Sequence, residues 1–191
     1  MNIPNILTVF RFVLTGYFVF FLYGQGIASR VAALFFFILA CVTDYYDGRY
    51  ARKYGQITFF GQLMDPIADK VLVFSAFLSF VQMGFIPAWM VLLMLTREVL
   101  ITVFRFVAVA KHVALPAEKQ GKRKTVLQTA SVICILIALI CAETSWWDPA
   151  WAQPAEAIIY VAVFAVTAFT LWSGLVYGVK YWKQAGSATA R

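Results

Sequence analysis

Four aspartates are concentrated in one short stretch of an otherwise apolar chain. They are four of its nine acidic residues, and each lies at or just beyond the end of a long apolar run: Asp44, Asp47, Asp65 and Asp69. Carboxylate oxygens are the ligands that Mg²⁺ and Mn²⁺ prefer, and two pairs of aspartates could bridge two ions about 4 Å apart. Such ions stabilise both the attacking and the leaving oxygen of a phosphoryl displacement. The stretch therefore predicts a site for two ions of Mg²⁺ or Mn²⁺, at which a phosphorylated substrate reacts.

The first pair of aspartates is spaced to lie on one face of a helix. Residues at i, i+3, i+4 and i+7 share a face, and the chain has there Asp44, Asp47, Gly48 and Ala51. Arg52 follows one position further round. Residues with little or no side chain allow a substrate to approach the backbone. Ion pairs with nearby lysines and arginines are the alternative explanation of the carboxylates, but pairing alone does not require this spacing.

The second pair of aspartates has a comparable pattern on the next predicted helix. Gly61, Asp65 and Asp69 follow one another at i, i+4 and i+8, which again places them on one side. Pro66 lies between the two aspartates. Since a proline is tolerated in the first turn of a helix, where the N–H groups have no partner within the helix, we expect this helix to start close to Pro66.

The elements that carry these residues are apolar enough to cross a membrane. The chain is 62% hydrophobic and only 13% charged, and about 20 apolar residues span about 30 Å of hydrocarbon. Six such runs are present, at about 6–24, 29–47, 67–84, 87–110, 124–142 and 156–181. The composition predicts an all-α integral membrane protein of six transmembrane helices. One domain would cover residues 1–182, followed by a short cytoplasmic tail, 183–191, in which "QAGSATAR" has no regular structure.

A cleaved signal peptide is the alternative explanation of the first run. Arg11 interrupts that run, no small-residue cleavage site ends it, and five more apolar runs follow. We therefore expect the first run to be a transmembrane helix. The cysteines, Cys41, Cys134 and Cys141, all fall inside predicted spans, where the simplest role for them is packing.

Lysine and arginine are distributed unevenly between the loops. They are frequent between the second and third runs, between the fourth and fifth, and after the sixth, whereas the other three loops have almost none. Because these residues are retained on the cytoplasmic side during insertion, both termini should be cytoplasmic. All four aspartates then lie at the cytoplasmic face of the membrane.

Several basic residues lie within or beside the apolar runs. Arg97 would lie at mid-depth, where an arginine needs a polar partner or cavity, and Arg105 would lie nearer the cytoplasm. Lys122 and Lys124 stand at the start of the fifth run. These four residues could bind a phosphate group. Glu98 could instead be an ion-pair partner of Arg97 or serve another helix, and the lysines could be simple determinants of topology.

Polar residues also recur at three-residue intervals near the start of the chain. Asn5, Thr8 and Arg11 share a helix face at the inner end of the first run. Asn5 and Thr8 could contact the phosphates of a substrate, or Asn5 could cap the helix. His112, the only histidine, has no neighbour at a spacing suited to metal binding.

The motif resembles the signature of the CDP-alcohol phosphotransferases, integral membrane enzymes of phospholipid synthesis. The pattern D-x2-D-G-x2-A-R-x8-G-x3-D-x3-D is complete, from Asp44 to Asp69. Three further segments resemble the bacterial phosphatidylglycerophosphate synthases of that family: "NIPNILTVFR" at the start, "TREVLI" from Thr96 and "GKRKT" from Gly121.

The resemblance implies a reaction and a set of roles. An alcohol attacks the phosphoanhydride of a CDP-linked lipid and CMP is released; here the substrates would be CDP-diacylglycerol and sn-glycerol 3-phosphate. The four aspartates would hold the metal ions, and Asp69 would also accept the proton of the alcohol. The residues expected to lie against the CDP-lipid are Asn5, Thr8, Gly48, Ala51, Arg52 and Gly61. Those expected to bind the acceptor phosphate are Arg97, Arg105, Lys122 and Lys124.

The resemblance further implies a homodimer in the bacterial inner membrane, with the active site facing the cytoplasm and no nucleic acid as partner. Other acceptors remain open, namely phosphatidylglycerol as in a cardiolipin synthase, inositol phosphate, or serine. A divalent-cation transporter is an alternative of another class, since intramembrane carboxylates also mark ion pathways. Against it, no acidic residue continues the path through the outer halves of the second and third runs.

Overall fold

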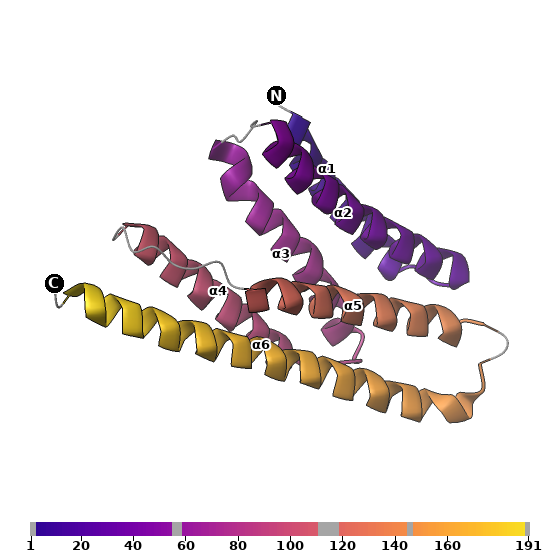
Figure 1. The fold of residues 1–191 in the computed structure, drawn as a ribbon. Helices are drawn as coiled ribbons and strands as arrows, with labels where there is room; N and C mark the ends of the chain where they lie inside the picture. The colour runs from indigo at the N-terminus through magenta and orange to yellow at the C-terminus, as the bar shows by residue number, and fades with distance from the viewer. Residues whose placement is uncertain (1–2, 55–58, 111–118, 145–146, 190–191) are drawn as a thin grey trace.

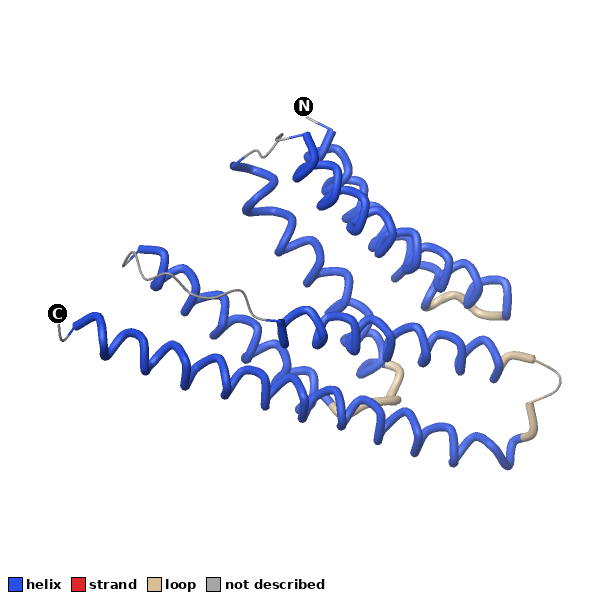
Figure 2. The backbone as a smooth tube through the Cα atoms, in the orientation of Figure 1, coloured by secondary structure: helices blue, strands red, loops and turns tan. Residues whose placement is uncertain are grey.

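A computed structural model describes the backbone of residues 3–54, 59–110, 119–144 and 147–189. Within these segments it describes the side chains of residues 9–44, 70–104, 124–144, 147–148 and 150–179. The described chain consists of helices and turns, with no strand in these segments (Figure 2). The elements are α1 (Ile3–Leu22), α2 (Ile27–Tyr54), α3 (Phe59–Gln82), α4 (Ala88–Ala110), α5 (Lys119–Ala142), the short 3₁₀ helix η1 (Pro149–Trp151) and α6 (Ala152–Thr189).

The helices are arranged as two groups joined by α3. Figure 1 shows α1 and α2 side by side, with α3 between this pair and the group formed by α4, α5 and α6. Helix α6 packs against both α4 and α5, while α3 contacts α1, α4 and α5, and α2 contacts α5. The start of α1, the end of α2 and the start of α3 lie together at the top of Figure 1. The motif residues are therefore carried by helix ends that face the same side of the molecule.

The interior combines an aromatic core with buried polar groups. Phe18 and Phe37 have ring centroids 5.3 Å apart, and Phe77 and Phe80 are fully buried in the same core. Polar side chains are also buried, notably on α5 and α6. The outside, by contrast, exposes many large apolar side chains, such as Phe20 with a relative accessibility of 72%. Apolar groups outward and polar groups inward are what a protein surrounded by lipid requires.

Three of the helices are long and apolar enough to cross a membrane. These segments are Ile27–Asp44, Lys124–Ala142 and Ala152–Val179, and shorter apolar segments occupy Val9–Leu22 and Lys70–Gln82. The all-helical prediction is confirmed for the described residues, and the apolar segments fit a membrane protein. Six crossings and the orientation of the termini remain predictions.

Several helix boundaries differ from those expected. Helix α3 starts at Phe59, so Pro66 is its eighth residue and does not lie in the first turn. The proline removes one backbone hydrogen bond, a loss that helices in membranes tolerate where neighbouring groups satisfy the freed carbonyl. Helix α5 starts at Lys119, so "GKRKT" is helical rather than part of a loop. Helix α6 continues to Thr189 through most of "QAGSATAR", where glutamine and alanine favour the helix.

Candidate active site

The backbone places the eight motif residues on two continuous helices. Helix α2 runs through to Tyr54, so Asp44, Asp47, Gly48, Ala51 and Arg52 follow one another on a single helix as the spacing predicts. Gly61, Asp65 and Asp69 follow one another in the same way on α3. The two stretches lie at the same end of the molecule (Figure 1). Of the eight side chains, that of Asp44 is among those the structure describes.

Asp44 is held by a buried arginine of α1. The Nη2 atom of Arg11 lies 2.6 Å from Oδ1 of Asp44, and the arginine side chain is only 1% exposed while that of Asp44 is 42% exposed. One turn along α1, the Thr15 hydroxyl donates a hydrogen bond of 2.8 Å to the carbonyl of Arg11. A buried guanidinium with one carboxylate oxygen in contact fixes the direction of that carboxylate. The partly exposed carboxylate of Asp44 is therefore held in one orientation.

The donor set fits a divalent cation by its chemistry. Among the described residues, no three His, Cys, Asp or Glu side chains are close enough together to hold an ion. The side chains of Asp47, Asp65 and Asp69 lie outside the described residues. Four carboxylates from successive turns of α2 and α3 supply the oxygen ligands that Mg²⁺ or Mn²⁺ takes. Arg11 contacts Asp44 in the way that an outer partner holds a ligating carboxylate.

A second charged cluster lies deeper, where α3, α4 and α5 meet. Glu98 on α4 is 7% exposed. Its Oε1 atom contacts the Lys124 ammonium of α5, and also lies 3.1 Å from Nη1 of Arg97. Its Oε2 atom lies 3.9 Å from Nζ of Lys70 on α3. A single carboxylate therefore contacts cations from three helices, and Lys70 directly follows Asp69 in the chain.

Hydroxyl groups complete the polar contacts of this cluster. The Lys70 ammonium donates a hydrogen bond of 2.6 Å to Oγ1 of Thr102, and Thr102 donates one of 2.8 Å to the carbonyl of Glu98. Arg97 donates from Nη2 to Oγ of Ser173 on α6, at 2.8 Å. Ser173 in turn donates to the carbonyl of Thr170 at 2.9 Å. Helix α6 thus becomes the fourth helix attached to the cluster.

Arg97 also depends on a glycine of α6 for its position. A Cβ atom placed on Gly174 would lie 2.8 Å from Cγ and 2.9 Å from Nε of Arg97. Contacts this short do not occur between unstrained side chains and a real Cβ. The absence of a side chain at Gly174 is therefore what allows the arginine to lie against α6.

The structure brings together some of the predicted site residues. Arg97 and Lys124 both contact Glu98, so two predicted phosphate-binding residues form one cluster. Asn5 and Thr8 lie on α1, Arg105 on α4 and Lys122 on the first turn of α5, but their side chains lie outside the described residues. His112 also lies outside the described segments.

Other residues of the site were missed or undervalued in the sequence. For Glu98 the sequence left two possibilities open, pairing with Arg97 or with a residue of another helix, and the structure shows both. Its contacts with Lys70 and Lys124 arise from helix packing. Ser173 and Gly174 gave no signal, because small residues are common in transmembrane helices.

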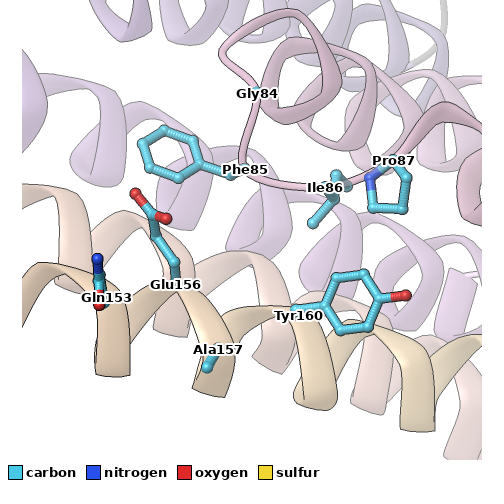
Figure 3. Close-up of a pocket in the computed structure, with 8 residues that line it drawn as sticks. All are labelled: Gly84, Phe85, Ile86, Pro87, Gln153, Glu156, Ala157 and Tyr160. Carbon is cyan, nitrogen blue, oxygen red and sulfur yellow. The ribbon is translucent and has the colours of Figure 1, made fainter.

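A shallow hollow of about 460 Å³ lies apart from both clusters. It is formed by the turn between α3 and α4, which includes Gly84 and Phe85, and by the beginning of α6. Figure 3 shows that the Glu156 side chain points from α6 toward Phe85. The lining contains this carboxylate and no lysine or arginine. Such a lining does not suit a phosphorylated substrate.

Comparison with known proteins gives one consistent result. Residues 1–179 match the family model of the CDP-alcohol phosphatidyltransferases. The chain is similar to a probable phosphatidylglycerophosphate synthase of Mycobacterium tuberculosis, with 36% identity over 94% of this chain and 79% of the relative. It is also similar to the CDP-diacylglycerol–glycerol-3-phosphate 3-phosphatidyltransferases of Bacillus subtilis and Escherichia coli. The identities are 33% over 95% of this chain and 96% of the relative for B. subtilis, and 34% over 92% of each chain for E. coli.

Proposed function

Because this chain belongs to the CDP-alcohol phosphatidyltransferase family, we propose that it transfers the phosphatidyl group of CDP-diacylglycerol to sn-glycerol 3-phosphate. The products are phosphatidylglycerophosphate and CMP, so the protein is an enzyme of phospholipid synthesis. The observation that carries the proposal is the complete aspartate motif on α2 and α3, in a chain whose relatives have that activity in their names.

The aspartates have two functions in this reaction. Asp44, Asp47, Asp65 and Asp69 would hold Mg²⁺ or Mn²⁺, two ions in all, and the ions would neutralise the charge of the phosphoanhydride and of the departing CMP. Asp69 also accepts the proton of the acceptor hydroxyl, while the hydroxyl oxygen forms a bond to the phosphorus of the phosphatidyl group. The bond from that phosphorus to the oxygen of CMP breaks. Arg11 orients Asp44 for its part in the site.

Residues of α1, α2 and α3 bind the lipid substrate. Gly48, Ala51 and Gly61 allow the CDP moiety to lie close to the backbone, and Arg52 pairs with its phosphates. Asn5 and Thr8 approach the same phosphates from α1.

The acceptor is bound by cations of α4 and α5. The phosphate of glycerol 3-phosphate is a dianion, and bringing it to the edge of the hydrocarbon requires paired positive charge. Arg97 and Lys124, which share Glu98, are the described candidates, and Arg105 and Lys122 belong to the same two helices. A neutral acceptor would not need these cations.

The expected orientation in the membrane follows from the distribution of lysine and arginine, and the expected location and dimer follow from the family. We expect six membrane crossings with both termini and the active site on the cytoplasmic side of a bacterial inner membrane. We also expect a homodimer.

An assay of products tests the proposed reaction. The purified chain, in detergent with CDP-diacylglycerol and Mg²⁺, should release CMP and form phosphatidylglycerophosphate with glycerol 3-phosphate. Phosphatidylglycerol, inositol phosphate and serine should each give far less product. CMP release with one of these alcohols and none with glycerol 3-phosphate would contradict the proposed acceptor but not the family.

A further inference from the structure

Glu98 is the one described carboxylate in a buried group of four charges. Arg97, Lys124 and Lys70 contribute three positive charges, and Glu98 contributes one negative charge. The described members therefore carry a net charge of +2. Arg97 and Lys124 are 7% and 6% exposed, so neither cation is exposed to solvent that could stabilise its charge. An ion pair that served only to hold helices together would balance its charges, because an unbalanced buried charge is destabilising.

Two buried polar groups in or beside the cluster can still form hydrogen bonds. The Nε atom of Arg97 and the Oγ1 atom of Thr170 are buried and have no hydrogen-bond partner among the described residues. Buried polar groups are normally paired, so these two N–H and O–H groups remain available to donate to an anion. The charge of +2 matches the phosphate of the proposed acceptor.

Glu98 fixes where these cations can receive that phosphate. Lysine has a long, flexible side chain whose ammonium can extend to the membrane surface. Lys124 lies near the start of α5, so without a partner its ammonium could reach the polar boundary. The contact with Glu98 keeps it in the interior beside Arg97. Glu98 also reaches Lys70, the residue after Asp69.

We propose that Glu98 is a positioning residue for the acceptor phosphate. It holds Lys124 and Arg97 together in the interior, in an arrangement with net positive charge that the phosphate completes. This inference rests on the proposed function, since it takes glycerol 3-phosphate as the acceptor. Glu98 itself need not touch the substrate.

Two opposing effects decide whether the KM for glycerol 3-phosphate rises or falls when Glu98 is replaced by glutamine. Removing the negative charge of Glu98 should by itself increase the attraction of the site for a phosphate. That attraction helps only while Lys124 stays in the interior, and a displaced lysine loses a charge-assisted hydrogen bond to the phosphate. We therefore expect the loss of position to dominate in Glu98→Gln.

The test is a kinetic comparison with matched variants of the full chain. In Glu98→Gln, the apparent KM for glycerol 3-phosphate should rise about 10-fold, equivalent to about 1.4 kcal/mol. The KM for CDP-diacylglycerol should stay within about twofold. Glu98→Asp, which keeps the charge, should recover part of the loss. Glu143→Gln is the control, because Glu143 also pairs with an arginine, Arg30 at 3.5 Å. Glu143 follows the last residue of α5, which lies roughly 27 Å along that helix from Lys124 at about 1.5 Å per residue.

A double variant keeps the test decisive if Glu98→Gln folds poorly. Glu98→Gln with Lys124→Gln removes both charges of one contact, so Lys124 does not remain as a buried cation without its partner. Its KM for glycerol 3-phosphate should be close to that of Lys124→Gln alone, because the main effect of Glu98 is to hold the lysine beside Arg97. Multiplication of the two single effects would overturn the proposal, as would an unchanged or lower KM in Glu98→Gln. If the parent uses another alcohol instead, the proposed function fails, and that result is separate from these comparisons.

Discussion

The guanidinium of Arg11, almost entirely buried in α1, lies 2.6 Å from the carboxylate of Asp44 on α2. The contact joins a helix without a motif carboxylate to the first aspartate of the motif. The proposed metal ligands all come from α2 and α3. Helix α1 therefore contributes by fixing the orientation of one of them.

Arg11→Gln should therefore weaken the response to metal. Loss of a partner that orients a ligand lowers metal affinity or activity by about 10- to 100-fold, so half-maximal activity should require correspondingly more Mg²⁺. The measurement is a Mg²⁺ titration of CMP release at saturating substrates. Arg30→Gln is the control, since Arg30 pairs with Glu143 instead, and its titration should match the parent. An unchanged midpoint in a folded Arg11→Gln variant would show that the contact is only structural.

Removal of metal should abolish turnover. Activity should disappear in excess chelator and return when Mg²⁺ or Mn²⁺ is added, because four carboxylates gathered at one site repel one another unless cations neutralise them. Full turnover in chelator, with no metal carried over in the preparation, is the result that would contradict a metal mechanism.

Asp69→Asn should abolish turnover but retain more CDP-diacylglycerol binding than Asp44→Asn. Asparagine keeps the size of the aspartate and cannot accept the proton of the alcohol. Binding of the lipid nucleotide to each purified variant, measured beside CMP release, separates the two functions. Equal loss of binding in both variants would make Asp69 primarily a metal ligand, and a parental rate would remove it from the mechanism.

Gly174→Ala should impair acceptor binding through Arg97. The added methyl would lie 2.8 Å from Cγ of the arginine, so either the side chain or α6 must move. We expect overpacking of about 1–3 kcal/mol in unfolding free energy and a raised KM for glycerol 3-phosphate.

Gly178 provides the matched control one turn further along α6. A Cβ there has no heavy atom within 4 Å, and alanine is favoured over glycine in a helix by about 1 kcal/mol. Gly178→Ala should thus leave both KM values unchanged and preserve thermal stability. Equal effects of the two substitutions would mean that the contact with Arg97 does not explain the loss.

Thiol labelling should locate the two ends of the helices. In a variant without the native cysteines, Gln56→Cys lies between α2 and α3 and should react only with reagents that reach the cytoplasm. Gln25→Cys, in the exposed turn between α1 and α2, should react from outside in intact cells. The reverse pattern would invert the expected topology.

The fold was largely predictable from the sequence because lipid imposes a simple rule on apolar segments. Runs long enough to cross the membrane identify the helices of the described chain, and the i, i+3, i+4 and i+7 spacing from Asp44 predicts a helix that the structure confirms. Boundaries were less predictable. Helix α5 begins at Lys119, five residues before the apolar run, because lysine, glutamine and arginine favour a helix almost as well as apolar residues do.

The contacts within the site were harder to predict than its members. Arg97 and Lys124 stand out as charges in apolar surroundings, but their shared partner depends on how α4 packs with α5. The sequence places Glu98 next to Arg97 and does not show its distance from Lys70 or Lys124. Gly174 matters through the space that it leaves, which only the packed helices define.

The division of the chain into α1–α3 and α4–α6 has a consequence for how new activities could arise. Under the proposed roles, the first three helices carry the reaction with the nucleotide lipid, while the cations that select the acceptor come mainly from the last three. Substitutions at Arg97, Lys124 or Ser173 could therefore change the accepted alcohol without altering any metal ligand. A chimera that keeps residues 1–82 and takes its later helices from a relative with another acceptor would show whether the last three helices determine which alcohol is used.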